Sequence, residues 1–535
     1  MKIPLWEPTK GQKDQANITR FVQFVNDEYG LTIDSYDQLY RWSIDNMSDF
    51  WSAMWIFGRI KYSNMYERVV DDLAKFPGAS WFVGAKLNFA ENLLRYKDES
   101  VALIFKGEAK KTATMTYSEL YYSVASLANY LRNIGVKPGD RVVGYMPNLI
   151  ETAIAMLAAT STGAIWASCA TDIGAQAAVN RLSQISPKVL FTADGYFYKG
   201  KAFNTLGSAR KVVNSMPSVR RVVIVRYIDE ETNINNIPNA VYFDEVVDIN
   251  KKSSIEFEQL PSYHPVYVMF SSGTTGKPKC LVQGIAGILV NQLKELMLHV
   301  DLRRGDKHLY ITTCSWMMWN WLLCSLAVGA TVVLYDGNPN YPDVGAIWNF
   351  IERERVTVFG TSASYINYLR SKGYKPREHH NLSYLREITQ TGSALSPEGF
   401  EYVYTAIKND LRFNSISGGT EINGCFVIGS PTLPVYAGEA QRAGLGMKIN
   451  CYDEKGKPVQ DQIGELVIES PTPPMPLYFW DDPEGRKYLN TYFNVYPNVW
   501  RHGDYIKIHS DTKGITFLGR SDAVLKPSGV RIGTA

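Results

Sequence analysis

Helix-like and strand-like segments alternate along the first third of this chain, and this alternation strongly constrains its fold. Thr116 and Glu119 match a capping box, and apolar residues then recur at helical spacing. A Pro-Gly turn precedes a predicted strand at 141–145, and a second helix and strand are predicted at 150–160 and 164–169. Strands that alternate with helices predict a mostly parallel sheet with helices on its faces.

The rest of the chain predicts several structural units, because 535 residues are too many for a single hydrophobic core. Beyond about residue 435, helical spacing fades and short strand-like runs predict a smaller β-rich region. Further strands are predicted at 189–191, 222–225, 309–312, 331–334 and 357–359. We expect four parts: an aromatic-rich leader (1–95), an α/β core with two sheets (96–434), a β-rich subdomain (435–518) and a hinge segment (519–535).

A loop rich in glycine and hydroxyl residues follows a strand-like run that ends at Phe270. It reads Ser271, Ser272, Gly273, Thr274, Thr275, Gly276, Lys277, Pro278 and Lys279. Glycines let backbone N–H groups approach an anion, hydroxyls add donors, and the lysines add positive charge. The spacing is not that of a Walker A motif. A strand that stops at such a loop predicts a phosphate site at the carboxyl end of a sheet, the alternative being a solvated surface loop.

Charge and cysteine content exclude several classes of function. The net charge is +3 without a basic block, so we expect no nucleic acid partner and no attraction to anionic membranes. The most apolar stretch, 149–170, contains Glu151 and many small residues, which predicts a buried helix and strand rather than a membrane span. The six cysteines form no Cys-x-x-Cys pair and no signal peptide is evident, so we expect reduced, buried thiols in a cytoplasmic protein.

Residues 271–279 resemble the nucleotide-phosphate loop of the acyl-adenylate-forming enzymes, which include acyl-CoA synthetases, luciferases and peptide-synthetase adenylation domains. The resemblance covers essentially the whole chain, because four further segments follow in the family's order. It implies an enzyme that activates a carboxylate with ATP and passes the acyl group to a thiol. ATP, Mg²⁺ and coenzyme A would be its substrates and cofactors, and AMP or an acyl-AMP would be bound. Thr275 and Lys277 would be catalytic, and the other loop residues would bind phosphate.

The second segment runs from Ser417 through Gly418 and Gly419 to Thr420 and Glu421. The resemblance implies that Thr420 contacts the α-phosphate and that Glu421 helps to hold Mg²⁺. A carboxylate suits this role, because Mg²⁺ prefers oxygen ligands. Thr-Glu pairs are common in loops, so this segment is weak evidence when taken alone.

The remaining segments would bind the nucleoside and form a hinge. Asp504 resembles the residue that accepts hydrogen bonds from the ribose hydroxyls, and Arg520 would lie near the ribose and phosphate. Asp522 resembles the hinge pivot, and Arg531 resembles an arginine just beyond it. The segment Gly392, Ser393 and Ala394 would lie against the adenine. Surface turns and salt-bridged surface arginines are the alternatives.

The resemblance narrows to the acetoacetyl-CoA synthetases in the leader and in the segments 475–480 and 492–504. Acetyl-CoA synthetases carry a tryptophan two positions before the Thr-Glu pair, where this chain has Gly418. The missing indole would widen the acyl pocket for acetoacetate, because volume decides fit in a packed pocket. Trp316 and Met317 would form another wall, or belong to the core. Ser417 and Asn423 are candidates for contact with the β-keto oxygen.

The expected fold is α/β: the large N-terminal domain of the adenylate-forming fold, with two helix-covered, mostly parallel sheets, a smaller β-barrel-like subdomain, and the C-terminal domain absent. That domain supplies a lysine for adenylate formation in the family, so we expect this chain to bind nucleotide but to catalyse poorly. Gln283 precedes Gly284 where many relatives carry an aromatic or histidine wall, which argues against an aryl acid.

Two alternatives remain open. The chain could be a ligase for another short or branched acid, with which Gly418 is also compatible. It could instead be a non-catalytic nucleotide-binding module. The sequence does not predict the oligomeric state.

Overall fold

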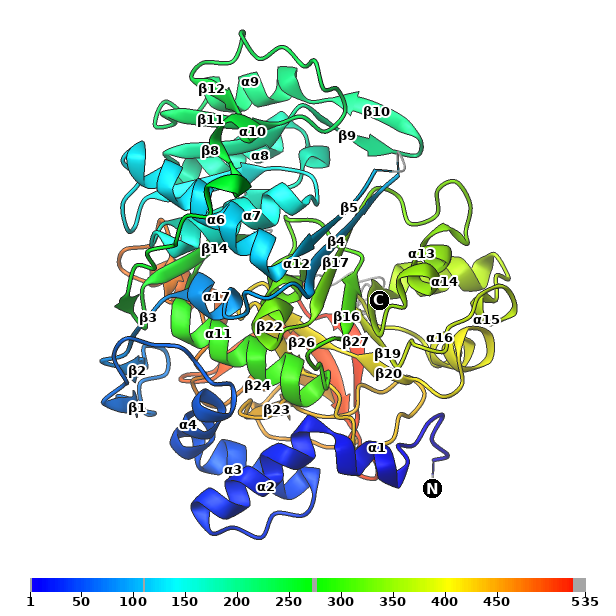
Figure 1. Cartoon of the computed structure of the whole chain (residues 1–535). Coiled ribbons are helices and arrows are strands. Elements are labelled where there is room, and N and C mark those ends of the chain that lie inside the picture. Colours follow the sequence, from blue (N-terminus) through cyan, green and yellow to red (C-terminus); the bar gives the residue numbers. More distant parts are fainter. Residues whose placement is uncertain (1, 109–110, 272–276, 523–535) are drawn as a thin grey trace, which may run out of the picture.

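Two large sheets with helices around them make up most of the protein, and a smaller sheet lies beside them (Figure 1). The structure, a computed structural model, describes residues 2–108, 111–271 and 277–522. None of the helices in these ranges is long and apolar enough to cross a membrane. All six cysteines are described, and they are buried and unpaired, as predicted.

The first sheet carries the predicted phosphate loop. Its eight strands lie in the order β12 (Ala240–Tyr242), β11 (Arg221–Val225), β8 (Val189–Ala193), β6 (Arg141–Tyr145), β7 (Ile165–Cys169), β14 (Pro265–Ser271), β15 (Lys279–Gly284) and β25 (Tyr478–Phe479). All pairings are parallel except the two made by β15. Because β14 ends and β15 begins at the loop, the loop joins two neighbouring antiparallel strands at the carboxyl end of β14.

Local sequence signals account for the helices around the first sheet. The helices are α6 (Tyr117–Asn133), α7 (Ile150–Ser161), α8 (Ala175–Leu182), α9 (Leu206–Asn214), α10 (Phe243–Val246) and α11 (Ile285–Lys294), and β9 (Gly195–Tyr198) pairs with β10 (Lys201–Asn204). The predicted capping box is confirmed, since Glu119 N–H donates to Thr116 Oγ1 over 3.1 Å and Thr116 N–H donates to Glu119 Oε2 over 2.7 Å. Such a box satisfies N–H groups that have no partner inside the helix.

The second sheet has seven strands and is parallel except for its last pairing. Its strands are β20 (Arg412–Ser415), β19 (Glu387–Thr391), β18 (Val358–Ser362), β16 (Lys307–Tyr310), β17 (Thr331–Asp336), β4 (Val101–Gly107) and β5 (Thr112–Thr116). The helices of this region are α12 (Met317–Leu323), α13 (Ala346–Glu354), α14 (Ala363–Ser371), α15 (Pro376–His379) and α16 (Pro397–Tyr402). The strands predicted near 309, 331 and 357 are confirmed.

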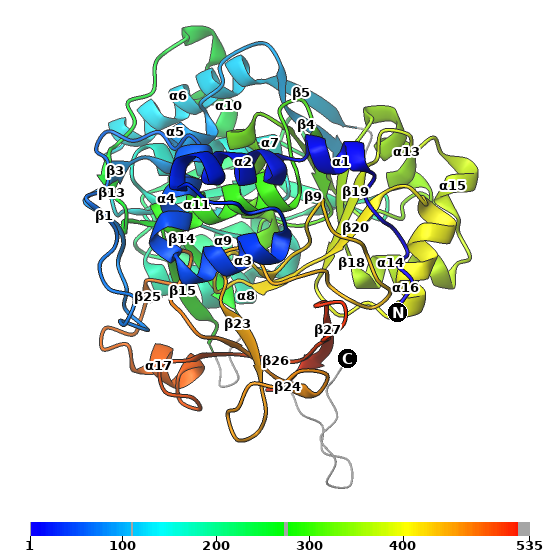
Figure 2. The same cartoon turned by 90° about the horizontal axis from the view of Figure 1, so that it is seen from below.

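The aromatic-rich leader packs on the body rather than standing apart from it. In Figure 2 the helices α2 (Asn17–Tyr29), α3 (Tyr36–Asp45) and α4 (Met47–Phe57) lie together across one face of the molecule. Trp51 and Trp55 are buried, and Tyr40 Oη donates a hydrogen bond to the carbonyl of Met447 over 3.0 Å. The leader also contains α1 (Lys10–Gln15), β1 (Arg68–Val70), β2 (Trp81–Val83), β3 (Lys86–Leu87) and α5 (Phe89–Leu93), and β3 pairs with β13 (Leu260–Pro261).

The smaller sheet is open and antiparallel, not a barrel. Its four strands lie in the order β23 (Ile449–Tyr452), β24 (Ile463–Ile468), β26 (Trp500–Ile508) and β27 (Ile515–Arg520), and α17 (Arg486–Tyr492) precedes β26. Gly519 and Arg520, where the hinge segment is expected to begin, are the last residues of β27, and Arg520 pairs with Asp504. Ser521 is buried and donates a hydrogen bond to Glu465 Oε1 over 2.6 Å. Arg520 and Ser521 therefore have hydrogen-bond partners that the polar composition of this part of the chain did not reveal.

Candidate active site

A cavity of 350 Å³ lies between the carboxyl ends of two strands of the second sheet and the smaller sheet. Seven residues predicted from three separate segments and one hinge motif line it: Gly392, Ser393, Ala394, Ser417, Gly418, Asp504 and Arg520. Their segments follow β19 and β20 or lie on β26 and β27. Ligands of parallel sheets bind at this end of the strands, so the position fits a nucleotide site.

The wall expected to face adenine is held in place by Gln390. Its Nε2 donates hydrogen bonds to the carbonyls of Thr391 and Ser393 over 3.2 and 2.9 Å. Gly392 has a φ of 95°, a backbone conformation that residues other than glycine rarely adopt. A Cβ at Gly392 would lie 3.5 Å from Cη2 of Trp316, so the half-exposed Trp316 ring lies beside this wall.

Gly418 lies where two strands approach each other too closely for a side chain. It belongs to β21 (Ser417–Gly419), which pairs with β22 (Gly424–Val427). A Cβ at Gly418 would overlap the carbonyl oxygen of Gly424 and lie 2.6 Å from Cα of Cys425. Close backbone packing therefore requires glycine here, and the pocket-widening role of Gly418 stays a prediction.

Glu421, the predicted metal ligand, is held by two side chains that sequence reasoning did not connect to it. Tyr492 Oη donates a hydrogen bond to Glu421 Oε1 over 3.0 Å, and Lys279 Nζ lies 3.9 Å from the same oxygen. Burial raises the pKa of Glu421, but His502 and Lys279 outweigh burial and leave the pKa lowered. Glu421 is therefore held as a carboxylate, the form in which it can bind a cation.

The predicted ribose ligand, Asp504, lies in a small network of charged groups. Arg520 donates to Asp504 Oδ1 over 3.4 Å and to Asp522 Oδ2 over 2.6 Å, which brings the predicted hinge residue beside the cavity. His502 Nε2 lies 3.6 Å from Asp504 Oδ2 and 3.3 Å from the carbonyl oxygen of Gly418. His502 was not predicted from the sequence as a site residue, and only its neighbours in space reveal it.

Several predicted residues are not brought into this cavity. Lys277 is exposed, and Met317 is half-buried and packs against the hydrophobic core. Ser271 Oγ is buried and has no hydrogen-bond partner within the described ranges. The predicted residues Ser272, Gly273, Thr274, Thr275, Gly276 and Arg531 lie outside the described residues.

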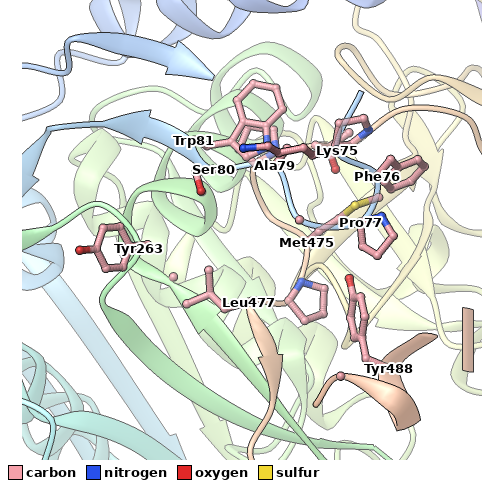
Figure 3. Close-up of a pocket in the computed structure, with 18 of the residues that line it drawn as sticks. Lys75, Phe76, Pro77, Ala79, Ser80, Trp81, Tyr263, Met475, Leu477 and Tyr488 are labelled. Atoms are coloured by element: carbon pink, nitrogen blue, oxygen red, sulfur yellow. The ribbon is translucent and has the colours of Figure 1, made fainter. Parts of the chain in front are cut away.

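A second cavity, of 630 Å³, lies elsewhere and contains none of the predicted site residues. Figure 3 shows Phe76, Pro77 and Trp81 on one side of it, with Met475 and Tyr488 nearby. Its lining is largely apolar and proline-rich, without the acidic and basic pair that marks the smaller cavity. The 350 Å³ cavity is therefore the candidate nucleotide site.

Known proteins resemble this chain along nearly its whole length. A model of the AMP-binding enzyme family matches residues 89–479, and one of the acetyl-coenzyme A synthetase N-terminus matches residues 36–93. An acetoacetyl-CoA synthetase from Danio rerio is 44% identical over 99% of this chain and 80% of that protein. A malonamoyl-CoA synthetase from Penicillium aethiopicum is 37% identical over 99% of this chain and 76% of that protein. The solved acetoacetyl-CoA synthetase from Streptomyces lividans is 40% identical, with a TM-score of 0.93 over 100% of this chain and 82% of that one.

The chain thus belongs to the AMP-binding enzyme family, and it is an AMP-forming acid–thiol ligase, a class that uses ATP and coenzyme A. Within that class it belongs to the acetoacetyl-CoA synthetase family, which it matches along nearly its whole length in both sequence and structure.

The expected fold class is wrong in its barrel-like subdomain, which is an open four-stranded sheet, and the comparisons do not support its description as a large N-terminal domain whose C-terminal domain is absent. The AMP-binding match ends at residue 479, and the described chain continues beyond it through α17, β26 and β27. Of the segment 519–535, which was taken for a linker, the structure describes 519–522, and Gly519 and Arg520 are the last two residues of β27. The expectation of poor catalysis depended on the absent domain, and the comparisons do not support it.

Proposed function

We propose that this protein joins acetoacetate to coenzyme A in two steps through an acetoacetyl-adenylate. The observation that carries the proposal is the convergence of Gly392–Ala394, Ser417–Gly418, Asp504 and Arg520 on one cavity at the carboxyl ends of strands. Family membership supports an enzyme over a non-catalytic nucleotide-binding module.

In the first step, a carboxylate oxygen of the acid attacks the α-phosphorus of ATP, and the bond to pyrophosphate breaks. In the second step, the sulfur of coenzyme A attacks the acyl carbon, the bond to AMP breaks, and the thiol proton is released. Negative charge accumulates at the phosphate in the first step, and preorganised donors and cations stabilise it. We assign this role to Thr275, Lys277 and Thr420, and also to Lys279.

Nucleotide recognition follows from the chemistry of the cavity walls. The backbone of Gly392–Ala394 would lie against adenine, and Asp504 would accept hydrogen bonds from both ribose hydroxyls. Arg520 neutralises Asp504 and faces the same cavity, so it would contact the ribose and the phosphate. The loop residues 271–276 would surround the remaining phosphates.

Glu421 fits a Mg²⁺ that is bound mainly through the nucleotide. No group of three or more His, Cys, Asp or Glu residues in the described part of the chain could hold a metal by itself. Mg²⁺ typically uses one or two carboxylates together with substrate phosphates, and Glu421 is an ionised carboxylate at the right place. When bound, the ion would neutralise phosphate charge.

Acetoacetate is the acid after which several relatives are named. The acyl pocket is the least defined part of the site. Trp316, Met317 and Gly418 are its proposed walls. Both amide atoms of Asn423 are engaged by Gln283 and Gln292, which leaves Ser417 as the proposed partner of the β-keto oxygen. A ligase for another short acid remains the second candidate, because one relative is named for malonamoyl-CoA. The cytoplasmic location stays a prediction.

Calorimetric binding of non-hydrolysable acetoacetyl-, malonamoyl- and acetyl-adenylate analogues tests the proposal. We expect the acetoacetyl form to bind at least tenfold more tightly than the acetyl form, about 1.4 kcal/mol. Tighter binding of the malonamoyl form would change the proposed substrate but leave the proposed two-step chemistry intact. Absence of binding by all three would contradict the site itself.

A further inference from the structure

We propose that Gln283 is a positioning residue, whose side-chain amide holds the Thr420–Glu421 turn in its catalytic geometry. The inference rests on the proposed function of that turn. Gln283 lies on β15, whereas the turn follows β21, and the two segments are 137 residues apart in the chain. Nothing in the sequence motif itself indicates this connection.

Both donor positions of the Gln283 amide are directed at the turn. Nε2 donates to the carbonyl of Thr420 over 2.7 Å and to the carbonyl of Glu421 over 3.1 Å. Gln283 is fully buried, so water does not compete for these carbonyls. A buried amide that makes two such bonds fixes the direction of two successive peptide groups, and thereby of the side chains that they carry.

The acceptor of the same amide is also used, which locks its orientation. Asn423 Nδ2 donates to Gln283 Oε1 over 3.1 Å. Asn423 is buried and has a φ of 42°, a left-handed conformation that needs support from its surroundings. Gln292 on α11 supplies that support, because its Nε2 donates to the carbonyl and to Oδ1 of Asn423, each over 3.1 Å.

The position of Gln283 on β15 connects the turn to the phosphate loop. Side chains alternate along a strand, so Lys279 and Gln283 share one face of β15. Lys279 lies 3.9 Å from the Glu421 carboxylate, and Gln283 holds the backbone of the same residue. One strand that begins at the phosphate loop therefore contacts the turn at two points and sets the distance between the two phosphate-binding segments.

Glutamine is the side chain that this arrangement requires. A glutamate at position 283 would oppose two carbonyl oxygens with a carboxylate, and a methionine would match the shape but leave both carbonyls without a donor. Leaving buried carbonyls unpaired costs free energy and lets the turn relax. Gln283 touches neither the adenine wall nor Asp504, so its effect passes through Thr420 and Glu421.

Adenylation kinetics of Gln283→Met, compared with Gln292→Met, test the proposal. Acid-dependent exchange of pyrophosphate into ATP isolates the first step. We expect Gln283→Met to lower kcat about tenfold to hundredfold with little change in the KM for ATP, because misplacing a catalytic group by even 1 Å has such effects. Gln292→Met removes the bonds to Asn423, which lies two residues beyond Glu421, and we expect a clearly smaller loss of kcat.

Two further measurements keep the outcomes distinct. The melting temperature and the calorimetric affinity for ATP of each variant show whether it is folded and binds nucleotide. If Gln283→Met does not fold, Gln283→Asn, which retains the amide but is one methylene shorter, takes its place. Equal kcat losses for positions 283 and 292, or a loss explained by the unfolded fraction alone, would overturn the positioning role. Absence of exchange by the unsubstituted protein with any acid would instead contradict the proposed function.

Discussion

Tyr492 Oη donates a hydrogen bond to Glu421 Oε1 over 3.0 Å, across 71 residues of sequence. The ring of Tyr492 stacks on that of Trp500, with centroids 3.7 Å apart and an interplanar angle of 10°. Lys279 Nζ lies 3.4 Å from the same phenol oxygen. The carboxylate proposed to bind Mg²⁺ is thus oriented by a rigid ring that lies beyond the AMP-binding match.

Replacing Tyr492 by phenylalanine keeps the stacking and removes only the donor. Hydrogen bonds to charged groups contribute about 1.5–3 kcal/mol, so we expect adenylation to slow about tenfold or more. The Mg²⁺ concentration needed for half-maximal ATP binding, measured by calorimetry, should also rise. Tyr488→Phe is the matched control, because Tyr488 lies on the same helix and its ring centroid is 5.9 Å from that of Trp500. Equal effects of both substitutions would argue against a specific role of the Tyr492 hydroxyl.

Asp504 should recognise the ribose through its two hydroxyls. We expect AMP to bind the unsubstituted protein at least tenfold more tightly than 2′,3′-dideoxy-AMP, a difference of about 1.4 kcal/mol. Asp504→Asn should bind AMP weakly and lose most of this discrimination. Titration calorimetry of both proteins with both nucleotides measures the coupling between the Asp504 carboxylate and the ribose hydroxyls. Discrimination that survives in Asp504→Asn would assign the ribose contact to another residue.

Gly418→Ala should damage the site by moving backbone, because its Cβ has no room between β21 and β22. Overpacking of this kind costs about 1–3 kcal/mol. We expect a lower unfolding free energy in urea together with loss of adenylation. Gly207→Ala in α9 is the control, since a Cβ there meets nothing within 4 Å. A Gly418→Ala protein with full stability and activity would show that the strands separate easily and that close packing does not require glycine at this position.

Asp336 should make the stability of the protein depend on pH. Burial raises its pKa from 3.8 to about 6, although Asn148 N–H and Tyr227 Oη both donate hydrogen bonds to it over 3.1 Å. A carboxyl whose folded pKa is raised favours folding when protonated, so its contribution is lost as pH rises from about 4 to about 6. The loss amounts to about 3 kcal/mol.

Asp336→Asn removes this titration. The difference in unfolding free energy, variant minus unsubstituted protein, should therefore grow by about 3 kcal/mol between pH 4 and pH 7. Urea unfolding at several pH values gives the difference, in which the contributions of other titrating groups cancel. A difference independent of pH would mean that Asp336 titrates normally in the folded state.

Local patterns in the sequence determined the elements of this protein and the identity of several site segments. The Thr116 capping box depends on residues three positions apart, and the helices and strands near it follow from spacing within a few residues. Gly392, Ser417, Asp504 and Arg520 could be proposed because each lies in a short motif, and the structure brings all four to one cavity.

Tertiary structure alone decided how those segments are held together and why some residues are needed. Gln283 and Tyr492 contact the Thr420–Glu421 turn from strands and helices that are distant in sequence, so strand order and register had to be known first. The packing at Gly418 depends on the facing backbone of β22, and the ordering of Ser521 depends on its bond to Glu465. Such contacts arise between surfaces that meet only after the chain has folded, and no local pattern of residues encodes them.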